Sequence, residues 1–166
     1  RRGWVVEKGT DKGLLEIYNP KSYKFEEQKK FVPKFDFSKR TGYWGPPEYL
    51  ISSFYSNKEV GKLLQSYVDE TGEKYDWVIS TRTDFAPVCN LASSLINKNT
   101  QDIITAFVPG SDWNINHMND PFVASNYENM IHWFNNYDYF EEDWLKGIDF
   151  CPHKLRFHHM KKLKKD

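Results

Sequence analysis

The chain has no excess of charge of either sign. Its 23 Lys and Arg residues are matched by 23 Asp and Glu residues, so the formal net charge at pH 7 is zero. A nucleic-acid-binding domain usually carries a basic excess that neutralises phosphates. The one basic run lies at residues 161–165, and such runs are usually solvated helix ends. The composition therefore argues against nucleic acid as a partner.

Cysteine and long apolar runs are also scarce. The two cysteines, Cys89 and Cys151, form no Cys-x-x-Cys pair, so neither a disulfide framework nor a zinc ribbon is indicated. This usage favours a reducing compartment. No apolar stretch approaches the length of a membrane span, so we expect no transmembrane segment. The glycine patterns of P-loops, dinucleotide-binding folds and α/β-hydrolases are missing too, which removes three common enzyme signatures.

The chain does have the length and composition of one globular domain. With 166 residues, of which 39% are hydrophobic and 28% charged, it can bury a sizeable core. We therefore expect a single domain over residues 1–166. The aromatic content of 17% fits either a core rich in Tyr and Trp or a surface on which sugars or bases stack.

Apolar spacing predicts strands that alternate with helices. We expect strands at residues 3–7, 22–26, 75–80 and 102–108, a long loop at 29–47, and helices at 11–18, before Gly72, after Ser125 and after Pro152. Two Ser-x-x-Glu capping boxes, at Ser56 and Ser125, mark helix starts, although the first of these helices can begin as early as Glu48. The alternation predicts an α/β domain with a mostly parallel sheet flanked by helices.

Two charged residues follow the strand expected at residues 75–80. In parallel sheets, ligands bind beyond the carboxyl ends of the strands, which is where Arg82 and Asp84 stand. The planar guanidinium of Arg82 can clamp a diphosphate, and the carboxylate of Asp84 can hold a divalent cation. A structural Arg–Asp pair that closes the strand fits the same spacing equally well.

The segment YDWVISTRTDF, at residues 75–85, resembles the signature of a group of GT-A-like glycosyltransferases from bacteria, phages and large viruses. In that group, Arg-x-Asp replaces the Asp-x-Asp motif of better-known GT-A enzymes. Four further landmarks of the group occur here in the same order. They are IYNPKSYKFEEQKKF at 17–31, SSFYSNKEVGKLLQSY at 52–67, NDPFVASNYENM at 119–130 and CPHKLRFHHM at 151–160. The resemblance covers nearly the whole chain and rests on the order and spacing of these motifs.

The resemblance implies a GT-A-like fold of the nucleotide-diphospho-sugar transferases. It also implies transfer of a sugar from a nucleotide-diphosphate donor to a glycan, a glycoprotein or another hydroxyl acceptor, as in polysaccharide biosynthesis. Together with the cysteine usage, it places the protein in the cytoplasm of a bacterial or virus-infected host cell.

The resemblance also assigns roles to particular residues. Asp84 would meet the metal or the donor sugar, with Arg82 beside it in donor binding. Asp120 matches an acid close to the acceptor, which in an inverting enzyme is the general base. Asn119 can bind sugar hydroxyls, although an Asn-Asp-Pro sequence equally suits a simple turn. Trp113, in the loop after the strand at 102–108, can stack on a sugar ring or merely pack its own loop.

The chain departs from the group's pattern in two important ways. Between Arg82 and Asp84 there is one carboxylate where Asp-x-Asp offers two, so two alternatives stay open: a bound Mn²⁺ or Mg²⁺, and partial replacement of its charge by Arg82. The group begins with a further strand and helix that have no counterpart here, so we expect the N-terminus of the protein to lie upstream of Arg1, and the donor site to be incomplete if nothing precedes this residue. The alternative to a glycosyltransferase is therefore a non-catalytic carbohydrate-binding or assembly module derived from the same fold.

Three histidines near the C-terminal end of the chain do not suggest a metal site. Their spacing does not bring His153, His158 and His159 to one face of a helix. We expect them to lie at the surface or at an interface.

Overall fold

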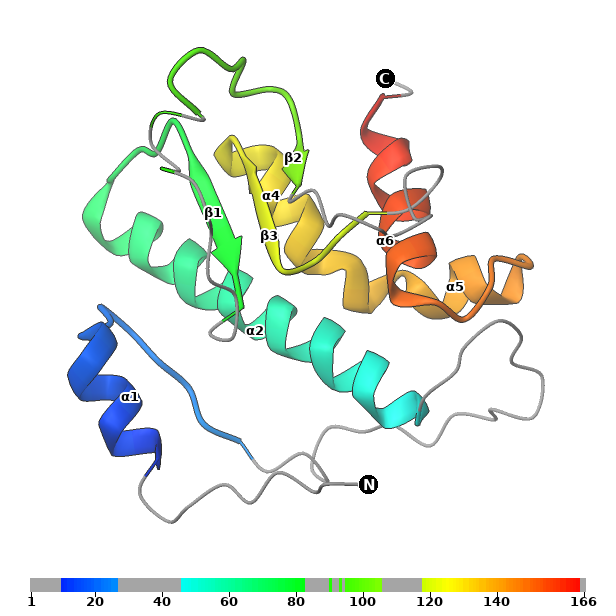
Figure 1. Cartoon of the computed structure of the whole chain (residues 1–166), viewed down its shortest axis with the longest axis horizontal. Coiled ribbons are helices and arrows are strands. Elements are labelled where there is room, and N and C mark those ends of the chain that lie inside the picture. Colours follow the sequence, from blue (N-terminus) through cyan, green and yellow to red (C-terminus); the bar gives the residue numbers. More distant parts are fainter. Residues whose placement is uncertain are drawn as a thin grey trace.

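The computed structural model describes residues 10–26, 46–82, 90, 93, 95–105 and 118–164. In this part of the chain the fold is mixed α/β. Its elements are α1 (Thr10–Tyr18), α2 (Pro47–Thr71), β1 (Val78–Thr81), β2 (Ile104–Thr105), β3 (Phe122–Ser125), α4 (Tyr127–Phe134), η3 (Asn135–Asp138), α5 (Phe140–Leu145), α6 (Pro152–Met160) and η4 (Lys161–Lys164). Helix α2 runs between α1 on one side and the sheet with α4, α5 and α6 on the other (Figure 1).

The described sheet is antiparallel, so the expectation of a mostly parallel sheet is wrong. The strand order is β1-β3-β2, and both outer strands pair antiparallel with β3. All four residues of β3 are buried, as befits a central strand. Sequence analysis missed β3 because its short apolar run shows no period that identifies a strand. Since β1 and β2 both run opposite to β3, their carboxyl ends lie at the edge where β3 begins.

Helix α2 begins and ends at residues with clear local signals. It starts at Pro47, whose missing N–H costs nothing in a first helical turn. It stops at Gly72, which adopts a left-handed φ of 67° and donates its N–H to the Val68 carbonyl oxygen at 2.8 Å. The stop is therefore confirmed, whereas the capping box at Ser56 is wrong because Ser56 lies inside the helix. Among the described residues, no helix combines the length and apolar content that crossing a membrane requires.

A glycine inside α2 allows this helix to lie close to α4. A Cβ atom added at Gly61 would stand 2.6 Å from the Cβ of Phe134, which is too close for two carbon atoms. Glycine in a helix interior costs about 1 kcal/mol relative to alanine. Here the absence of a side chain makes room for the aromatic ring, so Gly61 sets the distance between the two helices.

The core lies between α2 and the helices of the C-terminal half, and continues under the sheet. A first cluster joins α2 to α5 and α6, and consists of Leu50, Ile51, Phe54, Phe140, Trp144, Phe150 and Leu155. A second joins β3, α4 and α6, and consists of Met118, Val123, Met130, Trp133, Phe134 and Met160. Helix α6 contributes to both clusters, as expected for the helix predicted after Pro152.

The N-terminal described segment confirms one predicted element and corrects another. Helix α1 ends at Tyr18, and Asn19 then adopts a φ of 40°, which matches the stop expected at Asn19-Pro20. Residues 22–26 are not part of a sheet, contrary to the predicted strand. They lie along α2, where side-chain contacts rather than a strand hold them (Figure 1). The strand predicted at residues 3–7 falls outside the described residues, as does most of the predicted loop at 29–47.

The N-cap of helix α4 lies one residue later than predicted. The side chain of Asn126 accepts a hydrogen bond from the backbone N–H of Asn129 at 2.9 Å, so Asn126 is the N-cap. The hydroxyl of Ser125 instead hydrogen-bonds to the carbonyl oxygens of Thr100 at 3.2 Å and Asp102 at 2.9 Å. The capping box at Ser125 is therefore wrong, because Ser125 belongs to β3 and ties it to the segment before β2.

Candidate functional site

Arg82 and Asp120 are brought to the same edge of the sheet. The register pairs Thr81, the last residue of β1, with Phe122, the first residue of β3. The residue after β1 therefore lies beside the residues before β3. The backbone N–H of Arg82 and the hydroxyl of Thr81 both donate to the carbonyl oxygen of Pro121, each at 3.1 Å. Antiparallel pairing of β1 with β3 therefore brings Arg82 and Asp120 to one edge of the sheet.

The side chains of this edge border a polar cavity of about 320 Å³. Its walls come from α2, from the end of β1, from the segment before β3 and from α6. The lining residues are Ser53, Ser56, Asn57, Ser80, Thr81, Arg82, Asp120 and Arg156. Two guanidinium groups, one carboxylate and several hydroxyls make a surface that suits an anionic ligand rich in hydroxyl groups.

Arg156 is the site residue that sequence analysis missed. Its side chain is 1% exposed, and its Nη1 donates to Asp120 Oδ2 at 2.6 Å while its Nη2 donates to Ser53 Oγ at 2.9 Å. The guanidinium carbon lies 4.8 Å from the ring centroid of Phe54 and 5.0 Å from that of Trp133, so the charge also rests on two aromatic rings. Arg156 therefore fixes Asp120 in place and joins α2, α4 and α6 beneath the cavity.

A signal for Arg156 does exist in the sequence. The buried residues of α6 are Leu155, Arg156, His159 and Met160, which follow the spacing of one helix face. Arg156 is thus a charged residue on the face that points into the core, and such residues are almost always paired. The surrounding Lys and His residues hide this pattern because they make the segment look exposed.

The carboxyl of Asp120 is ionised at neutral pH. Burial raises its pKa, but the charge of Arg156, with smaller contributions from His153, from the Arg156 hydrogen bond and from Arg82, more than offsets this effect. The pKa of Asp120 therefore lies below its ordinary value. Since burial lowers the pKa of Arg156 from a value far above neutrality and Asp120 opposes that shift, the guanidinium keeps its charge. The two groups form an ion pair at the floor of the cavity.

The segment that carries Asp120 is also tied to the start of α6. The backbone N–H of Met118 donates to the carbonyl oxygen of His153 at 3.2 Å, and Nδ1 of His153 hydrogen-bonds to the carbonyl oxygen of Met118 at 2.8 Å. Asn119, which follows Met118, is partly buried and does not line the cavity. Its predicted contact with sugar hydroxyls stays a prediction.

The other two predicted site residues lie outside the described residues. Asp84 belongs to residues 83–89 and Trp113 to residues 106–117, so the metal contact of the first and the stacking role of the second stay predictions.

The described part of the cavity does not itself fit a divalent cation. Its one described carboxylate, Asp120, is paired with Arg156, and Arg82 adds a second positive charge. Mg²⁺ and Mn²⁺ prefer several oxygen ligands with negative charge. Nor do the described residues anywhere bring together three His, Cys, Asp or Glu side chains that could hold a metal ion. We therefore assign no chemical step to a metal.

The expectation of surface histidines is wrong for His159, which is buried at the contact of α4 with α6. Its ring stacks on that of His132 with a centroid distance of 4.0 Å and an interplanar angle of 4°. Each ring also hydrogen-bonds through Nε2 to the backbone carbonyl oxygen of the other residue, at 3.1 Å and 2.9 Å. The pair holds the C-terminal end of α6 against α4. Arg156 lies one turn earlier in the same helix.

Comparison with known proteins adds no relative from which a function could be transferred. No family model, no curated protein and no solved structure matches this chain. The choice of a function therefore rests on the residues and geometry of the site, and the resemblance of the motifs to GT-A enzymes stays a prediction.

Proposed function

We propose that the protein is a GT-A-like glycosyltransferase whose cavity between α2, the end of β1 and α6 binds a nucleotide-diphosphate sugar. The observation that carries this proposal is the meeting of Arg82, Asp120 and Arg156 around one polar cavity. Hydroxyl and amide groups of the same cavity supply partners for the hydroxyls of a sugar.

Arg82 is the group we assign to the diphosphate. It lines the cavity directly after β1, on a backbone fixed by its hydrogen bond to Pro121. During transfer, the bond from the anomeric carbon to the diphosphate oxygen breaks, and its electron pair leaves with the nucleoside diphosphate. A guanidinium at this place stabilises the added negative charge, and its planar donors match phosphate oxygens.

Asp120 is the group we assign to the acceptor. The acceptor hydroxyl oxygen forms the new bond to the anomeric carbon, and its proton passes to the carboxylate in an inverting reaction. The lowered pKa of Asp120 keeps the carboxylate ionised, as a proton acceptor must be, but it also makes the carboxylate a weaker base. Arg156 is a positioning residue that holds Asp120 from below.

One observation favours the second candidate, a non-catalytic carbohydrate-binding module of the same fold. Asp120 Oδ2 is engaged by a buried guanidinium, which is the arrangement of a structural ion pair. In that case the cavity binds its ligand without bond cleavage, and Asp120 serves only to shape it.

Isothermal titration calorimetry with UDP- and GDP-sugars, with and without Mn²⁺, tests the proposal. We expect the wild type to bind and Arg82→Ala to bind with a Kd at least about tenfold higher. The control is Lys146→Ala, which removes an exposed positive charge at the C-cap of α5 and should leave the Kd unchanged. Failure of every nucleotide sugar to bind, or equal binding by Arg82→Ala, would contradict the proposal.

Release of nucleoside diphosphate in the presence of an acceptor separates the two candidates. A transferase releases it in the wild type and loses that activity in Asp120→Asn while nucleotide-sugar binding persists. A binding module shows no release in either protein. Thermal unfolding of Asp120→Asn serves as the control for the fold, because this change removes the counter-charge of Arg156.

A further inference from the structure

A second cavity, of about 440 Å³, lies between α2 and the extended segment of residues 22–26. Ser56 lines both this cavity and the one that contains Arg82, so the two cavities adjoin at one residue of α2. Arg82, Asp120 and Arg156, which carry the proposed donor site, do not line the second cavity. Its walls differ in kind from those of the first, because they combine exposed aromatic rings with a network of balanced charges.

The aromatic wall is formed by Tyr23 and Phe25. The two ring centroids lie 5.6 Å apart at an interplanar angle of 51°, and both residues line the cavity. Tyr23 is 59% exposed and Phe25 54% exposed, and the half-exposed Val60 of α2 lies across from them in the same cavity. Apolar side chains gathered in an open cavity mark a surface that binds a partner.

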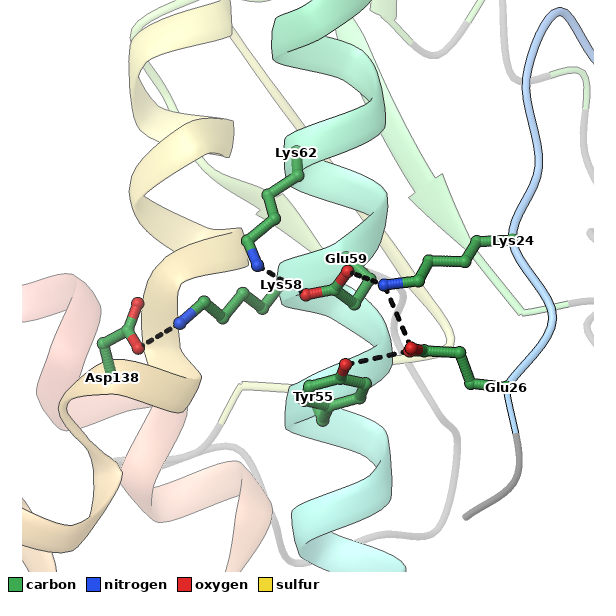
Figure 2. A network of polar contacts seen from close by, with 7 residues as sticks. All are labelled: Lys24, Glu26, Tyr55, Lys58, Glu59, Lys62 and Asp138. Atoms are coloured by element: carbon green, nitrogen blue, oxygen red, sulfur yellow. Dashed lines mark hydrogen bonds and ion pairs between the residues drawn. The ribbon is translucent and has the colours of Figure 1, made fainter. Parts of the chain in front are cut away.

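The polar wall is a fixed network of charged groups, shown in Figure 2. Lys24 pairs with Glu59 and, at 3.2 Å, with Glu26, while Lys62 donates to Glu59 at 2.7 Å and the hydroxyl of Tyr55 donates to Glu26 at 2.8 Å. Lys24, Glu26 and Glu59 line the cavity, and Lys62, which pairs with Glu59 from outside the lining, balances the charge of the network as a whole. The network therefore offers oriented donors and acceptors without a net charge.

Glu59 and the hydroxyl of Tyr55 keep their protonation states around neutral pH. Burial raises the pKa of Glu59, but its hydrogen bonds with Lys24 and Lys62 more than offset this, so the net shift is downward. The hydrogen bond to Glu26 raises the pKa of Tyr55, which keeps its hydroxyl protonated and donating. These groups present the same hydrogen-bonding pattern over a wide pH range.

This combination matches an uncharged sugar better than a nucleotide. The carbon-bound hydrogens on one face of a pyranose ring pack against aromatic rings, while its hydroxyls bond to carboxylates, ammonium groups and hydroxyls. The phosphates of a nucleotide would instead face the carboxylates of Glu26 and Glu59. The two guanidinium groups of the first cavity therefore suit a nucleotide sugar, whereas the rings and paired charges of the second suit an uncharged sugar.

We propose that the second cavity binds a neutral oligosaccharide, which is the acceptor, and that the glycan reaches the first cavity past Ser56. The identification of the glycan as the acceptor rests on the proposed glycosyltransferase function. Binding of the glycan itself does not, because the aromatic wall and the balanced network are sufficient for it.

An array of neutral hexose and N-acetylhexosamine oligosaccharides tests this inference, followed by titration of the strongest binder. We expect Tyr23→Ala and Phe25→Ala each to raise the Kd at least about tenfold, or about 1.4 kcal/mol. Tyr23→Trp keeps a stacking surface and should retain binding. Tyr49→Ala is the matched control, since Tyr49 is 64% exposed on α2 and lines neither cavity, and it should bind as the wild type does.

Several outcomes would overturn the inference. Binding to no oligosaccharide of the array, or equal binding by Tyr23→Ala and wild type, would do so. Loss of glycan binding in Arg82→Ala, with none in Tyr23→Ala, would place the glycan in the first cavity. Nucleotide-sugar binding without glycan binding would overturn this inference and leave the proposed function in place. Glycan binding that depends on Tyr23, without nucleotide-sugar binding, confirms a glycan site and overturns both its acceptor role and the proposed function.

Discussion

The two sides of α2 use the same kinds of charged residues for different purposes. Towards α4 and α6, Arg156 is enclosed by aromatic rings and pairs with Asp120. Towards residues 22–26, Lys24 and Glu59 belong to a network of ion pairs (Figure 2), in which the lysine side chain is 38% exposed and that of the glutamate 11%. A buried pair leaves an uncompensated charge when one partner is lost, whereas an exposed pair is replaced by water. The first arrangement therefore governs stability, and the second is available for recognition.

The largest expected effect follows from removing the buried guanidinium. We expect Arg156→Ala to lower the free energy of unfolding by about 3–5 kcal/mol, because the partly buried Asp120 then loses its ion-pair partner and the cavity floor is lost. Urea denaturation followed by circular dichroism measures this. Lys146→Ala, which breaks an exposed pair with Glu142, is the control and should leave the unfolding midpoint unchanged. Equal effects of the two changes would break the distinction between the sides of α2.

Acid should weaken the same side of α2 through His159. Burial, with the charge of His132, lowers the pKa of His159 to about 4 from an ordinary value of 6.5. The unfolded chain therefore binds a proton below pH 6.5, while the native state does not until about pH 4. Stability is constant above this window and falls as the pH drops through it, by roughly 3 kcal/mol.

The measurement is urea denaturation at a series of pH values between 7.5 and 4.5. In His159→Asn the part of the slope due to this ring disappears, whatever the change does to stability at pH 7.5. Identical slopes in the two proteins would show that folding leaves the pKa of His159 at its ordinary value. Protonation of Asp120 also lowers the stability of the folded protein, but only below the ordinary pKa of 3.8, so the two groups act in separate pH ranges.

A smaller loss is expected from crowding the contact of α2 with α4. In Gly61→Ala the new methyl group meets Phe134 at 2.6 Å, so one of the helices must shift, at a cost of about 1–3 kcal/mol. Gly13→Ala in α1 is the matched control, because among the described residues no heavy atom lies within 4 Å of its added Cβ and the helix gains propensity. Thermal unfolding of the two variants should show opposite signs, and a stabilised Gly61→Ala would contradict the packing described.

The smallest effect on stability belongs to the solvent-facing network. Lys24→Ala removes one partner of Glu26 and of the buried Glu59, but Tyr55 and Lys62 still bond to these carboxylates, so we expect only a small drop in the unfolding midpoint. Binding of a neutral oligosaccharide should weaken nonetheless, since the orientation of both carboxylates is lost. A large drop in the midpoint, measured by thermal unfolding, would show that the network is structural rather than available for recognition.

Local signals in the sequence predicted some helix ends, although both capping boxes were wrong. The stop at Gly72 depends on one residue that tolerates a left-handed backbone, and the start at Pro152 on one that needs no N–H partner. Strand β3 and the burial of Arg156 could not be predicted in the same way. The first depends on pairing with strands remote in the chain, and the second on Asp120, 36 residues away.

The candidate site was predicted in part, and for an incomplete reason. Arg82 and Asp120 do line one cavity, but antiparallel pairing of β1 with β3 brings them there, rather than a shared edge of parallel strands. The resemblance of the motifs pointed to both residues without knowledge of this topology. Asp84 and Trp113 lie outside the described residues, so the predicted metal contact and stacking await direct measurement.

The most direct test of the donor site is a titration of the ¹⁵N-labelled protein with UDP- and GDP-sugars, followed by amide chemical shifts. We predict that the largest shifts occur at Asn57, Thr81, Arg82 and Asp120, around the cavity of the two guanidinium groups. Shifts confined to other parts of the molecule, or none at all, would contradict the assignment of this cavity to a nucleotide-sugar donor.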